Sequence, residues 1–138
     1  MKMASTVIPC LTYEDAPAMI DWLCENFGFV RHEINSDGNG GISHAELRLG
    51  DGMIMLGSPH PHTEFGRAIS TPDKLGGTTQ SPYVIVDDVD GVYEKAKANG
   101  AEIVREIRAE SYGGRGFACL DPEGHLWSVG SYSPWATG

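Results

Sequence analysis

Residues 121–132 read Asp-Pro-Glu-Gly-His-Leu-Trp-Ser-Val-Gly-Ser-Tyr, a run of turn residues followed at once by an apolar stretch. Proline presets φ in a turn, glycine accepts positive φ, and aspartate hydrogen-bonds the turn backbone, so residues 121–124 predict a tight turn. The aromatic and β-branched residues that follow predict a strand through Ser128. A tight turn that leads directly into a strand is therefore the first element that the sequence predicts.

The same pattern occurs earlier in the chain. Residues 50–58 read Gly-Asp-Gly-Met-Ile-Met-Leu-Gly-Ser, and Gly52 lies 72 positions before Gly124. The same offset separates Asp15 from Asp87. Because the order of the predicted elements repeats as well, we expect two similar halves.

Each half is predicted to contain one helix and four strands. In the first half the helix begins after Asp15, a residue suited to the N-cap, and ends at Gly28. The strands expected there are residues 7–13, 29–34, 42–49 and 53–56. In the second half the expected elements are a helix at 88–99 and strands at 82–87, 102–107, 116–120 and 126–132.

The chain of 138 residues, 41% of them apolar, fits a single domain, residues 1–138. We expect it to be built of modules at about 5–58 and 80–133, joined by a linker at 59–79. The linker is rich in Pro, Gly, Thr and Ser, and it is predicted to be a mobile lid or an exchanged connection.

Charge and cysteine content limit the classes of partner. A net charge of −9 argues against nucleic acid and anionic membrane, because both require a surplus of Lys and Arg, and it favours cationic ligands. Three cysteines without paired metal-type spacing predict reduced, buried thiols in a soluble cytoplasmic protein: Cys10, Cys24 and Cys119. No apolar run is long enough to span a bilayer.

Two strand-helix-three-strand units in tandem resemble the vicinal oxygen chelate superfamily, which includes glyoxalase I, extradiol dioxygenases, fosfomycin-resistance enzymes and bleomycin-resistance proteins. The stretches that carry the resemblance are residues 7–15 with the helix that follows, 44–56 and 112–132. The resemblance implies an α+β fold of two βαβββ modules, whose curled mixed sheets form a cup with the helices on the convex face. It also implies a small-molecule ligand on the concave face and a homodimer.

The resemblance further implies where a metal ion would bind, because superfamily sites take a ligand from the first and fourth strands of each half. Those positions are Ile8, Met55, Ser81 and Ser128. None supplies the imidazole, carboxylate or thiolate that a divalent ion needs. We therefore predict a metal-independent protein without a cofactor. Whether His60 and His62, in the linker, bind a metal is left open.

His44 and Glu46 are candidate ligand contacts. They alternate with Ala45 and Leu47 on one predicted strand, so their side chains share the polar face. On a cup this face would meet the ligand; on a plain sheet it would meet water. Glu46 could also orient His44 as a general base.

Four further residues complete the predicted ligand-binding set: Met55, Tyr83, Arg115 and Ser128. Tyr83 could stack on a ligand or fill the core, and Arg115 could clamp an anion or be solvated. Trp127, adjacent to Ser128 in sequence, is expected to point the other way into the core.

The sequence favours a protein that binds a small molecule in a cup without a metal ion, similar to the bleomycin-resistance branch. The alternative is a lyase, isomerase or dioxygenase-type enzyme of the same superfamily with an atypical or metal-dependent site. No catalytic residue can be assigned from the sequence.

Overall fold

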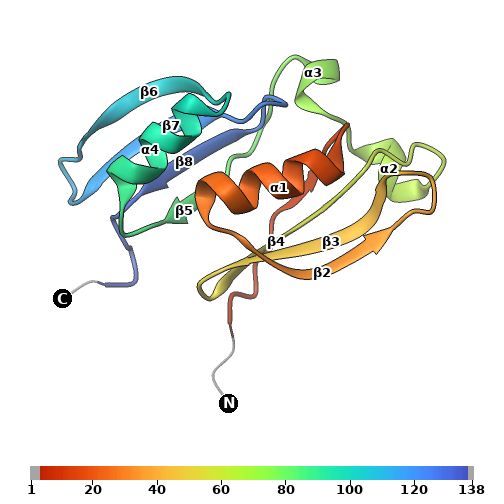
Figure 1. Cartoon of the computed structure of the whole chain (residues 1–138), viewed down its shortest axis with the longest axis horizontal. Helices are drawn as coiled ribbons and strands as arrows, with labels where there is room; N and C mark the ends of the chain where they lie inside the picture. Colours follow the sequence, from red (N-terminus) through yellow and green to blue (C-terminus); the bar gives the residue numbers. More distant parts are fainter. Residues whose placement is uncertain (1–3, 137–138) are drawn as a thin grey trace. The chain divides into compact units, whose positions relative to one another are not determined.

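The repeated pattern of the sequence corresponds to two units of sheet and helix in the computed structural model, which describes residues 4–136. The units are Met1–Leu75 and Gly76–Gly138. Each contains a four-stranded mixed sheet and one longer helix (Figure 1). The predicted α+β fold of two βαβββ modules is confirmed, and neither sheet closes into a barrel.

The first unit has the sheet order β1-β4-β3-β2. β1 runs parallel to β4, and the other neighbours are antiparallel. Its elements are β1 (Cys10–Thr12), α1 (Ala16–Phe27), β2 (Val30–Ser36), β3 (Ile42–Leu49) and β4 (Gly52–Gly57).

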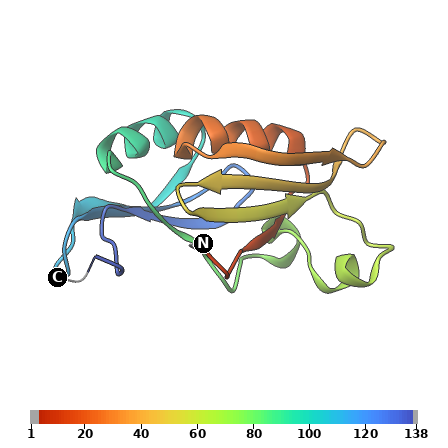
Figure 2. The ribbon, with the colours of Figure 1, turned by 90° about the horizontal axis from the view of Figure 1, so that it is seen from below.

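Helix α1 begins and ends where the sequence predicts. The Asp15 side chain accepts a hydrogen bond from the backbone N–H of Ala18, and Gly28 closes the helix with a φ of 86°, which favours glycine. The buried stripe of α1 comprises Ala16, Met19, Ile20, Leu23 and Phe27. Helix α1 lies along one face of the sheet (Figure 2), and Ala45 and Leu47 of β3 are fully buried.

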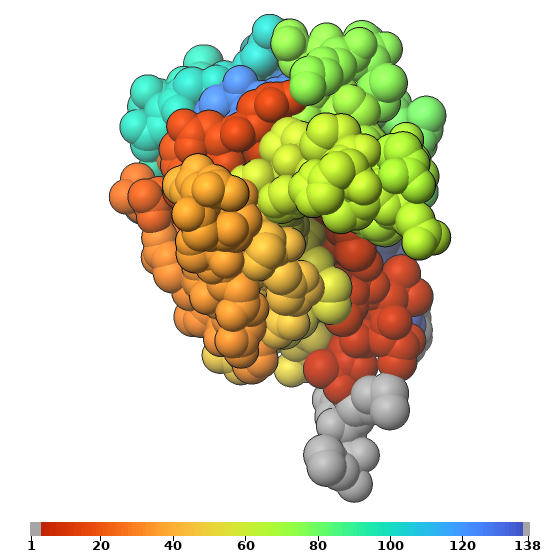
Figure 3. All heavy atoms as spheres, turned by 90° about the vertical axis from the view of Figure 1, so that its right-hand side faces the viewer, coloured from red at the N-terminus to blue at the C-terminus, as the bar shows by residue number. Residues whose placement is uncertain are grey.

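The segment after β4 is more ordered than the sequence predicts. It contains two short helices, α2 (Glu64–Ala68) and α3 (Pro72–Leu75). Thr71, only 1% exposed, donates a hydrogen bond to Glu14 over 3.1 Å. Figure 3 shows the yellow-green α2 region lying against the orange strands of the same unit. This part of the predicted linker therefore packs on the first unit.

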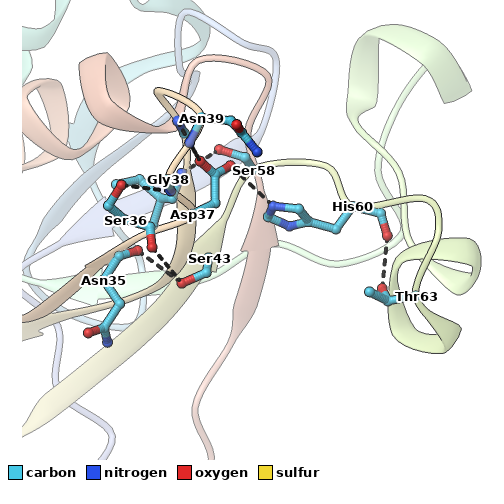
Figure 4. A network of polar contacts seen from close by, with 11 residues as sticks. Asn35, Ser36, Asp37, Gly38, Asn39, Ser43, Ser58, His60 and Thr63 are labelled. Carbon is cyan, nitrogen blue, oxygen red and sulfur yellow. Dashed lines mark hydrogen bonds and ion pairs between the residues drawn. The ribbon is translucent and has the colours of Figure 1, made fainter.

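The loop between β2 and β3 is fixed by Asp37 (Figure 4). Its Oδ1 accepts hydrogen bonds from the backbone N–H groups of Asn39 and Gly41 at 2.7 and 3.0 Å. Its Oδ2 lies 3.3 Å from His60 Nε2. Asp37 therefore ties the loop to the segment that follows β4, and His60 has a structural contact there.

The second unit repeats the plan, with the order β5-β8-β7-β6 and a parallel β5–β8 pair. Its elements are β5 (Tyr83–Ile85), α4 (Val89–Ala98), β6 (Glu102–Ala109), β7 (Arg115–Leu120) and β8 (Leu126–Gly130). Helix α4 is capped by Asp88 and buries Tyr93 against Phe117, with ring centroids 5.1 Å apart. The largest fully buried side chain is Trp127, which confirms its predicted place in the core.

The first strand of each half is shorter than predicted. Proline has no N–H for the sheet ladder, so regular pairing begins only after Pro9 and Pro82. Both prolines still accept a bond through their carbonyls, from the N–H groups of Met55 and Ser128.

The cysteines do not share one environment. Cys119 is buried, and burial raises its pKa to about 12. Cys24 is half-buried. Cys10 is exposed, so its predicted burial is wrong. It lies on the sheet face that α1 does not cover: the strand period separates Cys10 from Leu11 but does not say which of the two faces the helix covers.

Candidate ligand-binding faces

Each sheet has one face covered by its helix and one face that the helix does not cover, here called the open face. Paired residues on neighbouring strands project to the same side. In the first sheet Cys10 pairs with Met55, which pairs with Glu46. Because Leu47 and Leu56 are buried under α1, these three residues lie on the open face with His44.

Glu46 joins two histidines on this face. His44 Nε2 lies 2.8 Å from Glu46 Oε2, and His32 Nε2 lies 3.8 Å from Glu46 Oε1. The His44 ring is 41% exposed and the Glu46 carboxylate is half-buried. The structure thus brings together three of the predicted ligand contacts, His44, Glu46 and Met55, and adds His32.

The sequence did not reveal His32 because its position depends on a β-bulge. The pairing of β2 with β3 shifts between Arg31 and Glu33, so His32 lies outside the regular alternation. Arg31 pairs with Leu47 and binds Asp21 of α1, on the covered side. The bulge lets the next residue contact Glu46 on the open face.

In the second sheet, one row of paired residues crosses the open face. Tyr83 pairs with Ser128, Ser128 with Ala118, and Ala118 with Arg105. Phe117 lies on the other face, because its ring contacts Tyr93 of α4. The predicted ligand contacts Tyr83 and Ser128 are therefore neighbours on the open face.

The Tyr83 ring is held against the sheet. Its hydroxyl donates a 2.6 Å hydrogen bond to the carbonyl of Tyr132. A Cβ added to Gly130 would lie 2.7 Å from the Tyr83 hydroxyl and 3.3 Å from its ring, so only glycine leaves room for this placement. Burial raises the pKa of Tyr83, which keeps the hydroxyl protonated as a donor.

The structure places Arg115 apart from these residues. Its guanidinium binds both carboxylate oxygens of Asp90, at the start of α4, at 2.9 and 3.1 Å. Arg115 lies two residues from Phe117 on β7, which puts both on the face that α4 covers. A ligand anion at Arg115 would have to replace Asp90.

A cluster of one carboxylate and two arginines was not foreseen from the sequence. Glu110 Oε1 accepts hydrogen bonds from Arg105 Nη1 at 2.5 Å and from Arg108 Nε at 3.3 Å. Burial acts to raise the pKa of Glu110, but the bonds and charges of the arginines outweigh it and hold the pKa below its ordinary value. The carboxylate is therefore ionised at neutral pH.

The fold places the chain in the class of proteins built from two βαβββ modules in tandem. A family model for the Glyoxalase/Bleomycin resistance protein/Dioxygenase superfamily matches residues 4–129, and the chain belongs to that superfamily. The predicted membership is confirmed.

Three similar proteins illustrate the range of similarity. Uncharacterized protein Mb0911c of Mycobacterium bovis is 33% identical over 122 residues, which cover 88% of this chain and 80% of the relative. The crystal structure of TioX from Micromonospora sp. ML1 is 32% identical, with a TM-score of 0.70 over 94% of this chain and 99% of TioX. The fosfomycin resistance protein FosX of Mesorhizobium loti, at 13% identity and a TM-score of 0.65 over 97% of each chain, shares the fold.

The residues at the positions that the resemblance assigns to metal ligands are poor donors for a divalent ion. Met55 and Ser128 lie on the two open faces, and Ile8 and Ser81 precede β1 and β5. Within residues 4–136, no three His, Cys, Asp or Glu side chains form a group that could hold a metal ion. A thioether and a hydroxyl are weak donors for hard or borderline ions.

None of the helices within residues 4–136 is long and apolar enough to cross a membrane.

Proposed function

We propose that this protein binds a small organic molecule on the open faces of its sheets and does so without a metal ion. One observation carries the proposal: two of the positions that the superfamily resemblance assigns to metal ligands hold Met55 and Ser128, and both lie on open faces beside side chains suited to ligand contact. On the first sheet these neighbours are Glu46 and Cys10, and on the second sheet Tyr83 is the neighbour. Such faces offer apolar contact together with a few directed polar groups.

The test combines elemental analysis with ligand titration on the full chain. We expect protein purified without added metal to contain far less than one metal ion per chain, and its melting temperature to be unchanged by nickel, zinc, manganese or EDTA. Calorimetric titration with bleomycin, chosen because the superfamily includes bleomycin resistance proteins, should give binding in the micromolar range that EDTA does not affect. Stoichiometric metal, or a large stabilisation by one of the ions, would refute the metal-free proposal.

A second candidate function, acid–base catalysis, is favoured by the contact of His44 with Glu46. A carboxylate on one ring nitrogen fixes the tautomer and orientation of an imidazole, which leaves the other nitrogen to exchange a proton with a substrate. The 2.8 Å distance between the side chains supports such a pair. The reaction would be a proton transfer of the lyase or isomerase type.

The variants His44→Ala and Glu46→Gln separate the two functions. For an enzyme, both should lower kcat for a converted ligand by roughly 10²-fold or more while binding persists. For a binding protein, only the dissociation constant should change. Asn35→Ala, which alters the residue paired with His44, serves as the control.

We also propose that the protein is a homodimer and resides in the cytoplasm. Each sheet ends in two edge strands, β1 and β2 in the first and β5 and β6 in the second. Unpaired strand edges and exposed apolar side chains favour association, and Trp135 is one such side chain. The cytoplasmic location follows from the unpaired cysteines.

A further inference from the structure

We infer that the open face of the second sheet binds the anionic group of a flat organic molecule, with Arg105 and Arg108 holding the anion and Tyr83 contacting the apolar body. The inference rests on the proposed function and specifies the class of ligand. It stands on two groups of side chains on this face: Glu110 with the two arginines, and Tyr83 on the opposite edge strand.

The two arginines share a face only because β6 is bulged. Residues 105 and 108 are an odd number apart, so on a regular strand their side chains would point to opposite sides. The pairing with β7 shifts between them, and Arg105 pairs with Ala118 while Arg108 pairs with Gly116. Ala118 and Gly116 are two residues apart and lie on the same face, so both guanidinium groups reach Glu110 there.

Glu110 holds the arginines in position without using all their donors. Its side chain is 7% exposed, against 31% for Arg105. Each guanidinium carries five N–H donors, and Glu110 accepts from one on each. Planar guanidinium groups with free, exposed donors bind carboxylate or phosphate oxygens in a fixed geometry. Fixing the arginines in advance lowers the entropy lost when a ligand binds.

The local charge outweighs the charge of the whole chain. The two arginines and Glu110 together carry a net positive charge, although the chain carries −9. Glu106, between the arginines in sequence, lies on the covered side, where it accepts a hydrogen bond from the Tyr93 hydroxyl of α4. Charges farther than the Debye length, roughly 8 Å at physiological ionic strength, are largely screened. Glu102 lies at the other end of β6, paired with Leu120. An anion in contact with the arginines therefore experiences attraction.

The other edge of the same face is aromatic. Tyr83 is 42% exposed, and its ring is held over Gly130 by the bond to Tyr132. The residues between Tyr83 and Arg105 in the row, Ser128 and Ala118, are small. The row crosses three strand spacings, so the backbones of Tyr83 and Arg105 are roughly 14 Å apart. The side chains of these two residues occupy part of that distance. A fused two-ring aromatic carboxylate matches such a surface.

Three probes of similar shape and different charge test the inference on the full chain: naphthoate, naphthamide and naphthylmethylammonium. Titrations followed by amide NMR should show naphthoate binding about tenfold or more tightly than the other two, because hydrogen bonds to a charged group are the stronger ones. The largest shifts should occur at the amides of Ala118 and Ser128. Arg105→Ala should abolish the preference for the anion.

Arg31→Ala is the matched control, because Arg31 lies on the bulged strand of the first sheet and forms a surface ion pair with Asp21. It should leave the preference intact. Should Arg105→Ala fail to fold because Glu110 keeps only the weaker contact with Arg108, Arg108→Ala and Arg105→Lys replace it, and each should weaken the preference. Both are milder changes, since Arg108 is well exposed and Lys keeps the charge.

Equal affinity for the three probes, no binding of naphthoate at millimolar concentration, or shifts confined to the first unit would overturn the inference. The proposed function would survive these results if bleomycin still bound. If neither bleomycin nor any probe bound, the proposed function would fail as well, so the two failures are distinguishable.

Discussion

Asp121 shows at the scale of one residue how the turn that opens the last strand is joined to the core. The side chain is 3% exposed, and its Oδ2 accepts a 2.9 Å hydrogen bond from the indole N–H of Trp127. Oδ1 accepts from the backbone N–H groups of Glu123 and His125. One carboxylate thus accepts hydrogen bonds both from the turn backbone and from the largest buried side chain.

Replacing Asp121 with alanine should destabilise the protein by about 2–4 kcal/mol, because three donors lose their acceptor and the indole N–H is buried. Urea unfolding followed by tryptophan fluorescence measures the loss. Asp51→Ala, in the exposed turn before β4, is the control and should cost less than about 0.5 kcal/mol. A loss for Asp121→Ala as small as that of the control would contradict this account.

At the scale of elements, a bulge in each of two strands decides which side chains share a face. The bulge in β2 brings His32 to Glu46, and the bulge in β6 brings Arg105 and Arg108 to Glu110. The alternation of regular strands is readable from sequence, whereas the site of a bulge depends on pairing with the neighbouring strand. A sequence pattern therefore predicts the sheet face of each side chain only as far along the strand as the first bulge.

The loop between β2 and β3 gives a pH-dependent prediction. Hydrogen bonds from the backbone of Asn39 and Gly41 hold the pKa of Asp37 below its ordinary value of 3.8. A carboxyl group whose pKa is lower in the folded state stabilises the fold above the unfolded pKa, and this contribution is lost as the pH falls below it. Wild-type stability should therefore drop below pH 3.8 partly through this group.

Asp37→Asn should lower stability at neutral pH and make the decline in acid shallower than in wild type, as measured by urea unfolding at a series of pH values. Glu110 also contributes to the acid decline and is unchanged in this variant, so a residual slope is expected. Asp51→Asn should keep the wild-type profile. Parallel profiles for Asp37→Asn and wild type would show that the loop carboxylate has no such role.

At the scale of the whole molecule, each unit has its own core, and each sheet ends in two edge strands. Light scattering of the purified chain should therefore give twice the mass of one 14.9 kDa chain, since association covers edges and exposed apolar residues. The mass should be constant across a dilution series. A single-chain mass at micromolar concentration would contradict the proposed dimer.

Much of the fold was predictable because local signals agree with the packing. Asp15 and Asp88 cap helices, Gly28 ends one, and Trp127 fills the core. The candidate faces were predictable only in part. His44, Glu46 and Met55 lie together as alternation suggests, whereas Arg115 lies beside α4. Arg115 is two residues from the apolar Phe117 on the same strand, and this spacing was a usable sequence signal that Arg115 shares the face of Phe117.

The sequence by itself determined the two βαβββ units, their helix ends and the lack of strong metal donors at Met55 and Ser128, because turn chemistry, hydrophobic period and donor type are local properties. Only the tertiary structure decided that His32 meets Glu46, that two arginines meet Glu110, and that Arg115 binds Asp90. These contacts depend on strand register and on side chains far apart in the chain. The turn at residues 121–124 depends on both. Its turn type follows from the local sequence, whereas the hydrogen bond that Asp121 accepts from Trp127 is a tertiary contact.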